Sequence, residues 1–315
     1  MNNTLFGICG PTASGKTGLA IEVAKRVGGE IVSADSMQIY KGMDILSAKP
    51  TEDEMQGIPH HMIGVIETSA YFSASHYREM AGKVIEDIKA LGKIPLLCGG
   101  TGLYIDAVTR GMRFSEKSDE KLRRELKTIS EQPNGEMILH NMLKEMDPEA
   151  AEKYPPGDVR RVIRSIEINK LTGMTRKEQE YRDSLIKDTY DARLFAIDWP
   201  RDQLYDRINR RVDIMVKGGL INEVSSLMKE VEKGETTSVQ AIGYKEIAEA
   251  LKGEIAMSDA ITHLKTATRN YAKRQITWFK RDPRVTWLPV DNVSILADQI
   301  AEIIMHTEAH HGKLS

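Results

Sequence analysis

The stretch Gly10-Pro11-Thr12-Ala13-Ser14-Gly15-Lys16-Thr17 matches the phosphate-binding loop pattern G-x-x-x-x-G-K-[ST]. The apolar run Leu5–Cys9 lies directly before it and predicts a buried strand. The amphipathic run Thr17–Val27 lies directly after it and predicts a helix that ends at Gly28-Gly29. Strand, loop and helix therefore follow one another in the order that such a loop requires.

In a loop of this kind the backbone N–H groups surround phosphate oxygens, and the N-terminus of the following helix adds a partial positive charge. Lys16 would reach a terminal phosphate, and the hydroxyl of Thr17 would bind Mg²⁺. The alternative is a glycine-rich turn that binds no ligand. The pattern and its context favour a site for a di- or triphosphate, but they do not show what happens to that phosphate.

The composition is that of an ordinary soluble globular enzyme. The chain has 315 residues, 41% of them hydrophobic and 29% charged, and its formal net charge is -2. Contact with nucleic acid would therefore need local basic patches. Cys9 and Cys98 lie in apolar runs, which favours buried reduced thiols over a disulfide or a metal site. We expect a cytoplasmic protein, because no segment resembles a signal peptide or a membrane span.

Two further predicted strands lead into segments that are rich in polar residues or glycine. Glu30–Ser33 predicts a strand that is followed by Asp35, and Ile94–Cys98 predicts one that is followed by Gly99-Gly100-Thr101-Gly102. Chemistry gathers at the carboxyl ends of parallel strands, where a carboxylate serves Mg²⁺ or proton transfer. Asp35 is therefore a candidate functional residue, with a turn or helix-capping aspartate as the alternative. The glycines imply a close approach of the backbone to a ligand.

The region between these strands is predicted to be rich in loops over residues 41–75, with a helix over Ser73–Leu91. It contains the adjacent pair His60 and His61. Adjacent side chains point in different directions, so we expect packing or hydrogen bonding rather than a shared metal.

Strand signals stop near Ser115, and residues 119–187 predict successive charged amphipathic helices. Arg160 and Arg164 share one face of such a helix, with Arg161 beside them. Anion binding and a solvated or salt-bridged helix surface are both open for these arginines. We interpret the block as a helical insertion in a sheet domain.

The sheet is predicted to resume at Leu194–Trp199, followed by a helix over Arg201–Lys217 on which Arg207 and Arg211 share a face. An arginine here would offset charge on a leaving pyrophosphate. A long helix from about Ser258 ends in a run in which basic residues, among them Lys273 and Arg274, alternate with aromatic ones. This mixture is typical of a nucleic-acid surface, although the aromatic side chains could instead be core.

The remaining elements complete an α/β fold. Val285–Leu288 predicts a last strand and Ile295–Ile304 a terminal helix, with a polar end from His306 that we expect to fray. The predicted fold is a phosphate-loop NTPase-like parallel sheet core flanked by helices, over residues 1–114 and 190–315, with an inserted all-helical domain over residues 115–189.

Four segments occur together in this chain: the phosphate loop, Asp35-Ser36-Met37-Gln38, Gly99-Gly100-Thr101-Gly102-Leu103-Tyr104, and Ala272-Lys273-Arg274-Gln275-Ile276-Thr277-Trp278. In this combination the chain closely resembles the bacterial tRNA dimethylallyltransferases, the tRNA isopentenyltransferase family. The resemblance extends from about Phe6 to Trp278. The chain departs from the family pattern at Leu46-Ser47 and at Gly64, which puts local loop structure in doubt rather than activity.

The resemblance implies transfer of a dimethylallyl group from dimethylallyl diphosphate to N6 of adenosine 37, beside the anticodon of tRNAs that read codons starting with U. The phosphate loop would then hold a leaving pyrophosphate rather than ATP. The partners expected are the tRNA anticodon stem-loop, contacted by the helical insertion, and dimethylallyl diphosphate, with Mg²⁺ as cofactor. We expect a monomer that binds no membrane.

The resemblance also implies roles for single residues. Asp35 accepts the N6 proton as general base, Lys16 and Arg211 offset charge as pyrophosphate departs, and Thr101 hydrogen-bonds the adenine or the bridging oxygen. The target adenosine must be flipped out to reach them. The diphosphate is held by Gly10, Thr12, Ala13, Ser14, Gly15, Lys16 and Thr17, with Mg²⁺ on Thr17. The tRNA is contacted by Asp35, Ser36, Met37, Gln38, Thr101, Arg123, Val159, Arg160, Arg161, Val162, Ile163, Arg164, Gln240, Gly243, Tyr244, Lys245, Lys273 and Arg274.

Two alternatives belong to other functional classes. A small-molecule kinase would use ATP through the same loop, but it explains neither the basic-aromatic helix nor the arginines of the insertion. An RNA-binding protein with a vestigial loop is disfavoured, because Lys16, Thr17, Asp35 and Thr101 are all present.

Overall fold

The computed structural model describes residues 3–111, 119–231 and 237–312, which form two compact units. One unit comprises Met1–Thr109 and Thr189–Ser315, and the other comprises Arg110–Asp188. The first boundary expected from the sequence, between residues 114 and 115, lies outside the described residues. The chain leaves and re-enters the larger unit at one point, because the N–H of Thr189 donates to the carbonyl of Thr109 at 2.9 Å.

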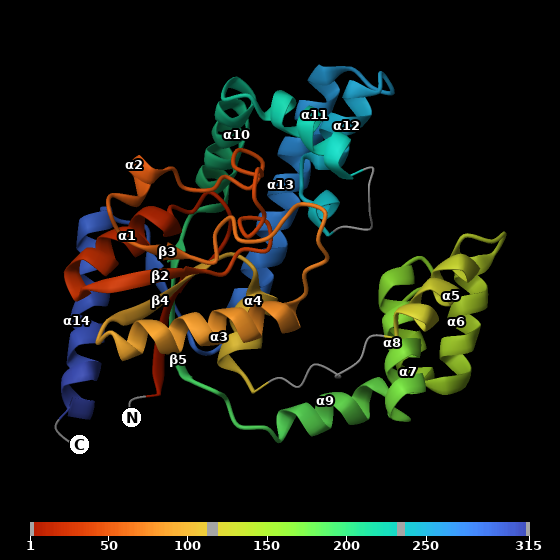
Figure 1. The fold of residues 1–315 in the computed structure, drawn as a ribbon, viewed down its shortest axis with the longest axis horizontal. Coiled ribbons are helices and arrows are strands. Elements are labelled where there is room, and N and C mark those ends of the chain that lie inside the picture. The colour runs from red at the N-terminus through yellow and green to blue at the C-terminus, as the bar shows by residue number, and fades with distance from the viewer. Residues whose placement is uncertain (1–2, 112–118, 232–236, 313–315) are drawn as a thin grey trace. The chain divides into compact units, whose positions relative to one another are not determined.

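The larger unit is built on a six-stranded parallel sheet, as the sequence predicts (Figure 1). In chain order the strands are β1 (Thr4–Cys9), β2 (Gly29–Ser33), β3 (His60–His61), β4 (Ile94–Gly99), β5 (Asp191–Asp198) and β6 (Val285–Pro289). Their order in the sheet is β3-β2-β4-β1-β5-β6. Strand β3, with two residues, was not predicted. The segments that follow β1, β2, β4 and β5 therefore all lie at one edge of the sheet.

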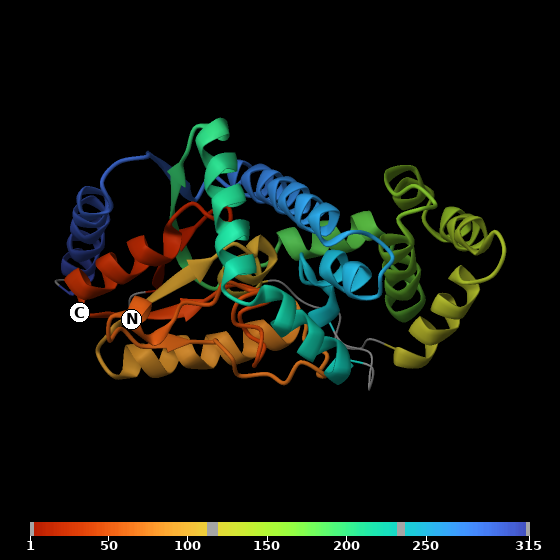
Figure 2. The same cartoon turned by 90° about the horizontal axis from the view of Figure 1, so that it is seen from above.

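Helices cover both faces of this sheet (Figures 1 and 2). The helices described in the larger unit are α1 (Lys16–Val27), α2 (Glu52–Met55), α3 (Ala74–Ala90), α4 (Gly102–Thr109), α10 (Arg201–Lys217), α11 (Leu220–Val231), α12 (Tyr244–Leu251), α13 (Met257–Lys280) and α14 (Val293–Gly312), with a short 3₁₀ helix, η1 (Ser238–Gln240). The side chains of β1 alternate: Phe6 and Ile8 pack into the core under α1 and α14, whereas Leu5 and Cys9 pack into the core on the other face, with α3 and α4. Both cysteines are buried and free, as expected.

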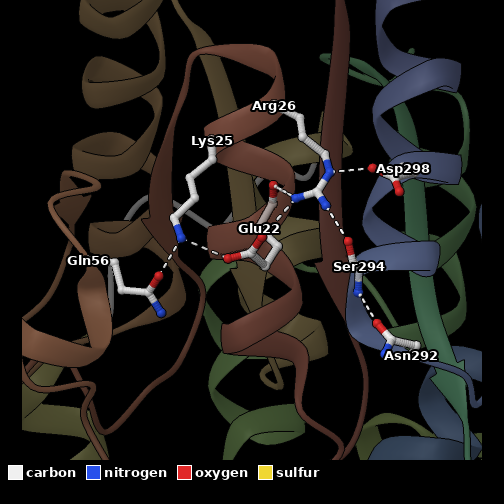
Figure 3. Close-up of polar contacts among 7 residues, drawn as sticks. All are labelled: Glu22, Lys25, Arg26, Gln56, Asn292, Ser294 and Asp298. Atoms are coloured by element: carbon white, nitrogen blue, oxygen red, sulfur yellow. Dashed lines mark hydrogen bonds and ion pairs between the residues drawn. The ribbon is translucent and has the colours of Figure 1, made fainter.

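Helix α14 packs along α1 and is also tied to it by polar contacts at the surface (Figure 3). Arg26 on α1 donates to Asp298 at 2.6 Å and to Ser294 at 2.7 Å. The helix runs to Gly312, so the expectation of a frayed end from His306 was wrong. Within this last part of the helix, Thr307 is buried and accepts a hydrogen bond from Arg193 of β5 at 3.0 Å.

The smaller unit contains only helices among its described elements, in agreement with the predicted all-helical insertion. They are α5 (Glu120–Ser130), α6 (Gly135–Met146), α7 (Pro148–Lys153), α8 (Val159–Thr172) and α9 (Arg176–Ser184). Side chains such as Leu126, Leu139, Val162 and Ile166 form a separate apolar core. This unit therefore has the hydrophobic interior that an independent folding unit needs.

No helix in the described part of the chain is both long and apolar enough to cross a membrane.

Candidate active site

The phosphate loop curls between β1 and α1 in a conformation that needs several positive φ angles. The values are +127° at Gly10, +62° at Ala13 and +90° at Gly15, which caps the helix. The first amides of α1 have no carbonyl of that helix to donate to. Ser14 is buried, and its hydroxyl has no hydrogen-bond partner among the described residues. These features fit a cradle for an oxygen-rich anion.

Three side chains hold the loop from outside. Trp199 Nε1 donates to the carbonyl of Ser14 at 2.8 Å, and Arg207 Nε donates to the carbonyl of Ala13 at 2.8 Å. The Arg207 guanidinium also lies 4.4 Å from the centre of the Trp199 ring. The outward-facing carbonyls of the loop are thus bonded by residues that follow β5.

Gln275 of α13 is the third of these side chains, and it links two loops. Its Oε1 accepts from the N–H of Thr12 at 2.9 Å, and its Nε2 donates to the carbonyl of Gly100 at 2.9 Å. The N–H of Thr12 is therefore already bonded to the protein. Thr12 can reach a ligand through its side chain, since it lines the pocket described below.

The glycines at the end of β4 and directly after it are required by protein neighbours. A Cβ on Gly99 would lie 2.1 Å from the carbonyl oxygen of Ala34, and one on Gly100 would lie 2.1 Å from Gln275 Nε2. Within the protein, these two glycines allow the close approach of Ala34 and Gln275.

The segments that carry Asp35 and Thr101 contact each other where they follow β2 and β4. Asp35 Oδ1 accepts from the N–H groups of Met37 at 2.9 Å and Gln38 at 3.4 Å, so Asp35 does form a turn. Thr101 Oγ1 accepts from the N–H of Ser36 at 3.0 Å. The second carboxylate oxygen of Asp35 has no hydrogen bond to the described residues, and Asp35 lines a pocket. The turn and a catalytic role are therefore compatible.

A pocket of about 220 Å³ extends from the phosphate loop. Its polar lining includes Thr12, Asp35, Ser36, Arg211 and Arg274. Its apolar lining is formed by Ala13, Met37, Leu46, Ala48, Ile208, Val212, Met215, Ala241, Ile242 and Leu264. An apolar wall beside a phosphate cradle suits a ligand with a phosphate head and a hydrocarbon body.

The loop that carries Leu46 and Ala48 is held by carboxylate and carbonyl contacts. Glu223 of α11 accepts from the N–H groups of Asp44, Ile45 and Leu46 at 3.0, 2.8 and 2.7 Å. The carbonyl of Ala48, a residue with φ of +47°, accepts from both Gln38 and Arg211 at 3.3 Å. One wall of the pocket is therefore fixed by charge-assisted bonds.

Lys16, Arg211 and Asp35 influence one another electrostatically. Burial lowers the pKa of the Lys16 ammonium, and the Asp35 carboxylate opposes this effect. Burial also lowers the pKa of Arg211, again opposed by Asp35. Two partly buried cations would gain from a bound anion, because an anion offsets their mutual repulsion.

The two histidines have different surroundings. His61 Nε2 contacts the Glu30 carboxylate at 2.7 Å, which joins β3 to β2. His60 Nδ1 lies 2.8 Å from the carbonyl oxygen of Ile58, and burial lowers the pKa of the His60 ring. Packing or hydrogen bonding was expected for both, and each ring forms a hydrogen bond. His60 also lines a small cavity beside Lys16, Thr17 and Asp35.

No group of three or more His, Cys, Asp or Glu side chains in the described part of the chain is placed to hold a metal. Mg²⁺ does not require one, since it commonly keeps several waters and takes one or two protein ligands together with substrate phosphates. Thr17 and Asp35 line the same small cavity. These residues fit a Mg²⁺ ion held by the Thr17 hydroxyl and diphosphate oxygens.

Of the expected RNA-contacting residues in the larger unit, Gln240 and Arg274 line the pocket, and Lys245 and Lys273 are exposed. Arg274 also lies over the Tyr271 ring, 5.7 Å from its centre. Gly243 is buried, and a Cβ there would lie 2.9 Å from Leu46 Cδ1. Tyr244 begins α12 and packs against the core of this unit.

In the smaller unit the expected residues divide into core and surface. Val162 has no exposed surface, and Val159 and Ile163 pack against the same core, so these three side chains belong to the interior of this unit. Arg160 and Arg161 are exposed, with Arg161 paired to Asp158 at 2.6 Å. The salt-bridged surface that the sequence left open is thus present at Arg161.

Arg123 and Arg164 share one carboxylate. Glu167 has no exposed surface, and it accepts from Arg123 Nη2 at 3.0 and 2.9 Å and from Arg164 Nη1 at 2.8 Å. Both guanidinium groups are partly exposed. A buried carboxylate bonded to two arginines fixes their positions at the surface.

Sequence reasoning missed Gln275, Glu223 and Glu167, and it gave Trp199 no role at the loop. A signal existed for one of them: Glu167 lies between Ile166 and Ile168 in an apolar stretch, three residues after Arg164. The others act through contacts between distant segments, which no local pattern reveals.

Comparison with known proteins gives a consistent result. A model of the family described as IPP transferase matches residues 38–282. A protein named tRNA dimethylallyltransferase from Caldanaerobacter subterraneus subsp. tengcongensis is 47% identical over 288 residues, which cover 90% of this chain and 91% of that protein. A similarly named protein from Thermoanaerobacter sp. is 45% identical over the same length.

Solved structures agree. The full-length tRNA isopentenylpyrophosphate transferase of Bacillus halodurans is 41% identical, with 99% of each chain covered and a TM-score of 0.73. A eukaryotic dimethylallyltransferase acting on tRNA is 30% identical, with 93% of this chain and 75% of that chain covered and a TM-score of 0.79.

Proposed function

The chain belongs to the IPP transferase family, and we propose that it transfers a dimethylallyl group from dimethylallyl diphosphate to N6 of adenosine 37 in tRNAs that read codons starting with U. The observation that supports this most directly is the pocket, in which an apolar wall adjoins the phosphate loop and Asp35. A kinase would need a site for a nucleotide base and sugar, whereas a short hydrocarbon needs only the apolar wall. Because the proposed substrate is a tRNA, we propose that the protein acts in the cytoplasm.

In the proposed reaction the N6 amine attacks C1 of the allylic chain. The C–N bond forms, the C–O bond to the diphosphate breaks, and pyrophosphate leaves with the electron pair. Lys16 and Arg211 stabilise the charge that develops on the leaving group. The N6 proton passes to Asp35 Oδ2, the oxygen that does not take part in the turn.

The other residues of the site position these groups. Thr101 holds Ser36 through its N–H and thereby orients the segment that begins with Asp35. The loop amides and Ser14 bind the diphosphate. The Thr17 hydroxyl would hold a Mg²⁺ ion, which supplies positive charge to the diphosphate oxygens. The apolar residues exclude water, so the allylic carbon meets the amine rather than a hydroxide.

The proposed tRNA contacts follow charge and exposure. Lys245, Lys273, Arg160 and Arg161 are exposed cations suited to backbone phosphates. Gln240 and Arg274 line the pocket and would contact the flipped-out nucleotide. We propose that the smaller unit binds the anticodon stem-loop and that the protein acts as a monomer.

The deciding experiment incubates the full chain with labelled dimethylallyl diphosphate, unmodified tRNA and Mg²⁺. The label should appear in tRNA, and nuclease digestion should place it on adenosine 37. EDTA should abolish transfer if Mg²⁺ is required. Consumption of ATP without labelled tRNA would favour the kinase alternative instead, and binding of tRNA with neither reaction would favour the RNA-binding alternative.

A further inference from the structure

Beside the phosphate loop lies a second, much smaller cavity, distinct from the 220 Å³ pocket. Its volume is about 10 Å³, which is close to the space that a single water molecule needs. Its polar lining comprises Lys16, Thr17, Ser33, Asp35, Gln38 and His60. Thr17 and Asp35 place this cavity on the side of the loop where the proposed Mg²⁺ ion binds.

His60 has no role in the reaction derived above, yet its ring is held in a defined state. The Ile58 carbonyl can only accept a hydrogen bond, so the proton must be on Nδ1, which lies 2.8 Å from it. Nε2 is then left with a free lone pair. This atom is buried and has no hydrogen-bond partner among the described residues. A buried acceptor without a partner is costly, which suggests that a ligand supplies the missing donor.

The neighbouring His61 does not share this arrangement, because its Nε2 has a partner within the protein. Its Nε2 contacts Glu30 at 2.7 Å, so that ring is committed to joining β2 and β3. His61 does not line the cavity.

We propose that His60 is an outer ligand of the Mg²⁺ ion at Thr17, with Nε2 accepting a hydrogen bond from a water molecule bound to that ion. This inference rests on the metal-dependent diphosphate site of the proposed function. Mg²⁺ keeps most of its waters in such sites, and its waters are strong donors. Outer partners of this kind orient the hydration shell and raise metal affinity. His60 lies on β3, which is separated from β4 in the sheet by β2. Strand β3 would thereby contribute a residue to the metal site.

The test uses the full chain, inorganic pyrophosphate and a titration of MgCl₂, with pyrophosphate binding followed by calorimetry. His60→Asn retains a donor for the Ile58 carbonyl but has no counterpart of Nε2. We expect the Mg²⁺ concentration at half-maximal enhancement of pyrophosphate binding to rise about tenfold in this variant. Pyrophosphate affinity without Mg²⁺ should be unchanged. His61→Gln, which can still contact Glu30, is the matched control and should behave as wild type.

A Mg²⁺ midpoint in His60→Asn within about twofold of wild type would overturn the proposal, because His60 would then hold only a structural water. A second measurement avoids dependence on the variant. In the wild-type protein, Mn²⁺ with pyrophosphate should broaden the His60 ring resonances far more than those of His263 or His306, and equal broadening would count against an ion near His60. Dimethylallyl transfer by the wild-type protein is assayed separately. If the wild type transfers no dimethylallyl group but its Mg²⁺ midpoint depends on His60, only the proposed function is rejected.

Discussion

At the scale of single residues, Asp35 combines two roles that its position in the sequence could not separate. One oxygen accepts two backbone N–H groups and forms the turn over residues 35–38. The other oxygen is available at the pocket that adjoins the phosphate loop. Fixing one oxygen in a turn orients the other, so the structural role supports the catalytic one.

Asp35→Asn separates these roles. The amide oxygen can still accept from Met37 and Gln38, but the side chain can no longer take up a proton. We expect the transfer rate to fall by about 10²–10⁴-fold, with pyrophosphate affinity and melting temperature close to wild type. Single-turnover transfer to tRNA, calorimetry and thermal unfolding measure the three quantities.

Asp35→Ala removes both roles and serves as the comparison. It should lose the same activity and, in addition, about 1 kcal/mol of unfolding free energy through the missing turn bonds. If Asp35 were only a turn residue, Asn would be nearly as active as Asp and only Ala would be impaired.

At the scale of elements, the order of strands and helices follows from the sequence because its signals are local. The apolar runs before the phosphate loop and before Gly99 gave strands within one or two residues of those observed. The all-helical insertion followed from the loss of strand signals after Ser115. Periodicity and glycine breaks were sufficient for these elements.

The features that the sequence did not reveal depend on contacts between residues far apart in the chain. Strand β3 has two residues, too few for a periodic pattern, and exists because it pairs with Ile31 and Val32 of β2. The last turns of α14 include a contact with a distant strand, since Arg193 of β5 donates a hydrogen bond to Thr307. Asp35 and Thr101 could be predicted as site residues because they follow strands, whereas Gln275 lies in a run that gives no sign of Thr12 or Gly100 beside it.

Helix α13 connects these observations, because Gln275 joins the phosphate loop to the segment that carries Thr101. Gln275→Met keeps the volume but leaves the Thr12 N–H and the Gly100 carbonyl without partners. We expect the unfolding free energy to fall by about 2–4 kcal/mol. Pyrophosphate affinity should fall about tenfold, since the loop would have to be ordered on binding. Denaturant unfolding and calorimetry measure these effects.

Thr277→Ala is the control for Gln275, since Thr277 is exposed on the same helix and bonds only the carbonyl of Lys273 within it. It should leave both quantities within experimental error. A Gln275→Met protein with wild-type affinity for pyrophosphate would show that the loop holds its conformation without α13.

At the scale of the whole molecule, the chemistry belongs to the larger unit, whereas the proposed tRNA contacts are divided between the two units. Every residue that lines the 220 Å³ pocket lies in the larger unit. The smaller unit has its own core and the buried Glu167, which holds Arg123 and Arg164. An insertion that folds on its own can add an RNA-binding surface without disturbing the sheet.

The hydrogen bond between Thr109 and Thr189 allows this division to be tested directly. Replacing residues 110–188 with the dipeptide Asn-Gly would make Thr109 and Thr189 the first and fourth residues of a β-turn whose closing bond, at 2.9 Å, is already present. The shortened protein should fold and bind pyrophosphate with Mg²⁺ as the full chain does, because its pocket and phosphate loop are complete. Its affinity for tRNA should fall about tenfold or more, with a weaker salt dependence, because the phosphate contacts of Arg160 and Arg161 are gone.

Calorimetry with pyrophosphate and filter binding of tRNA at several salt concentrations measure both effects. Unchanged tRNA affinity would remove the smaller unit from RNA binding, and loss of pyrophosphate binding would show that the larger unit depends on the smaller one to fold.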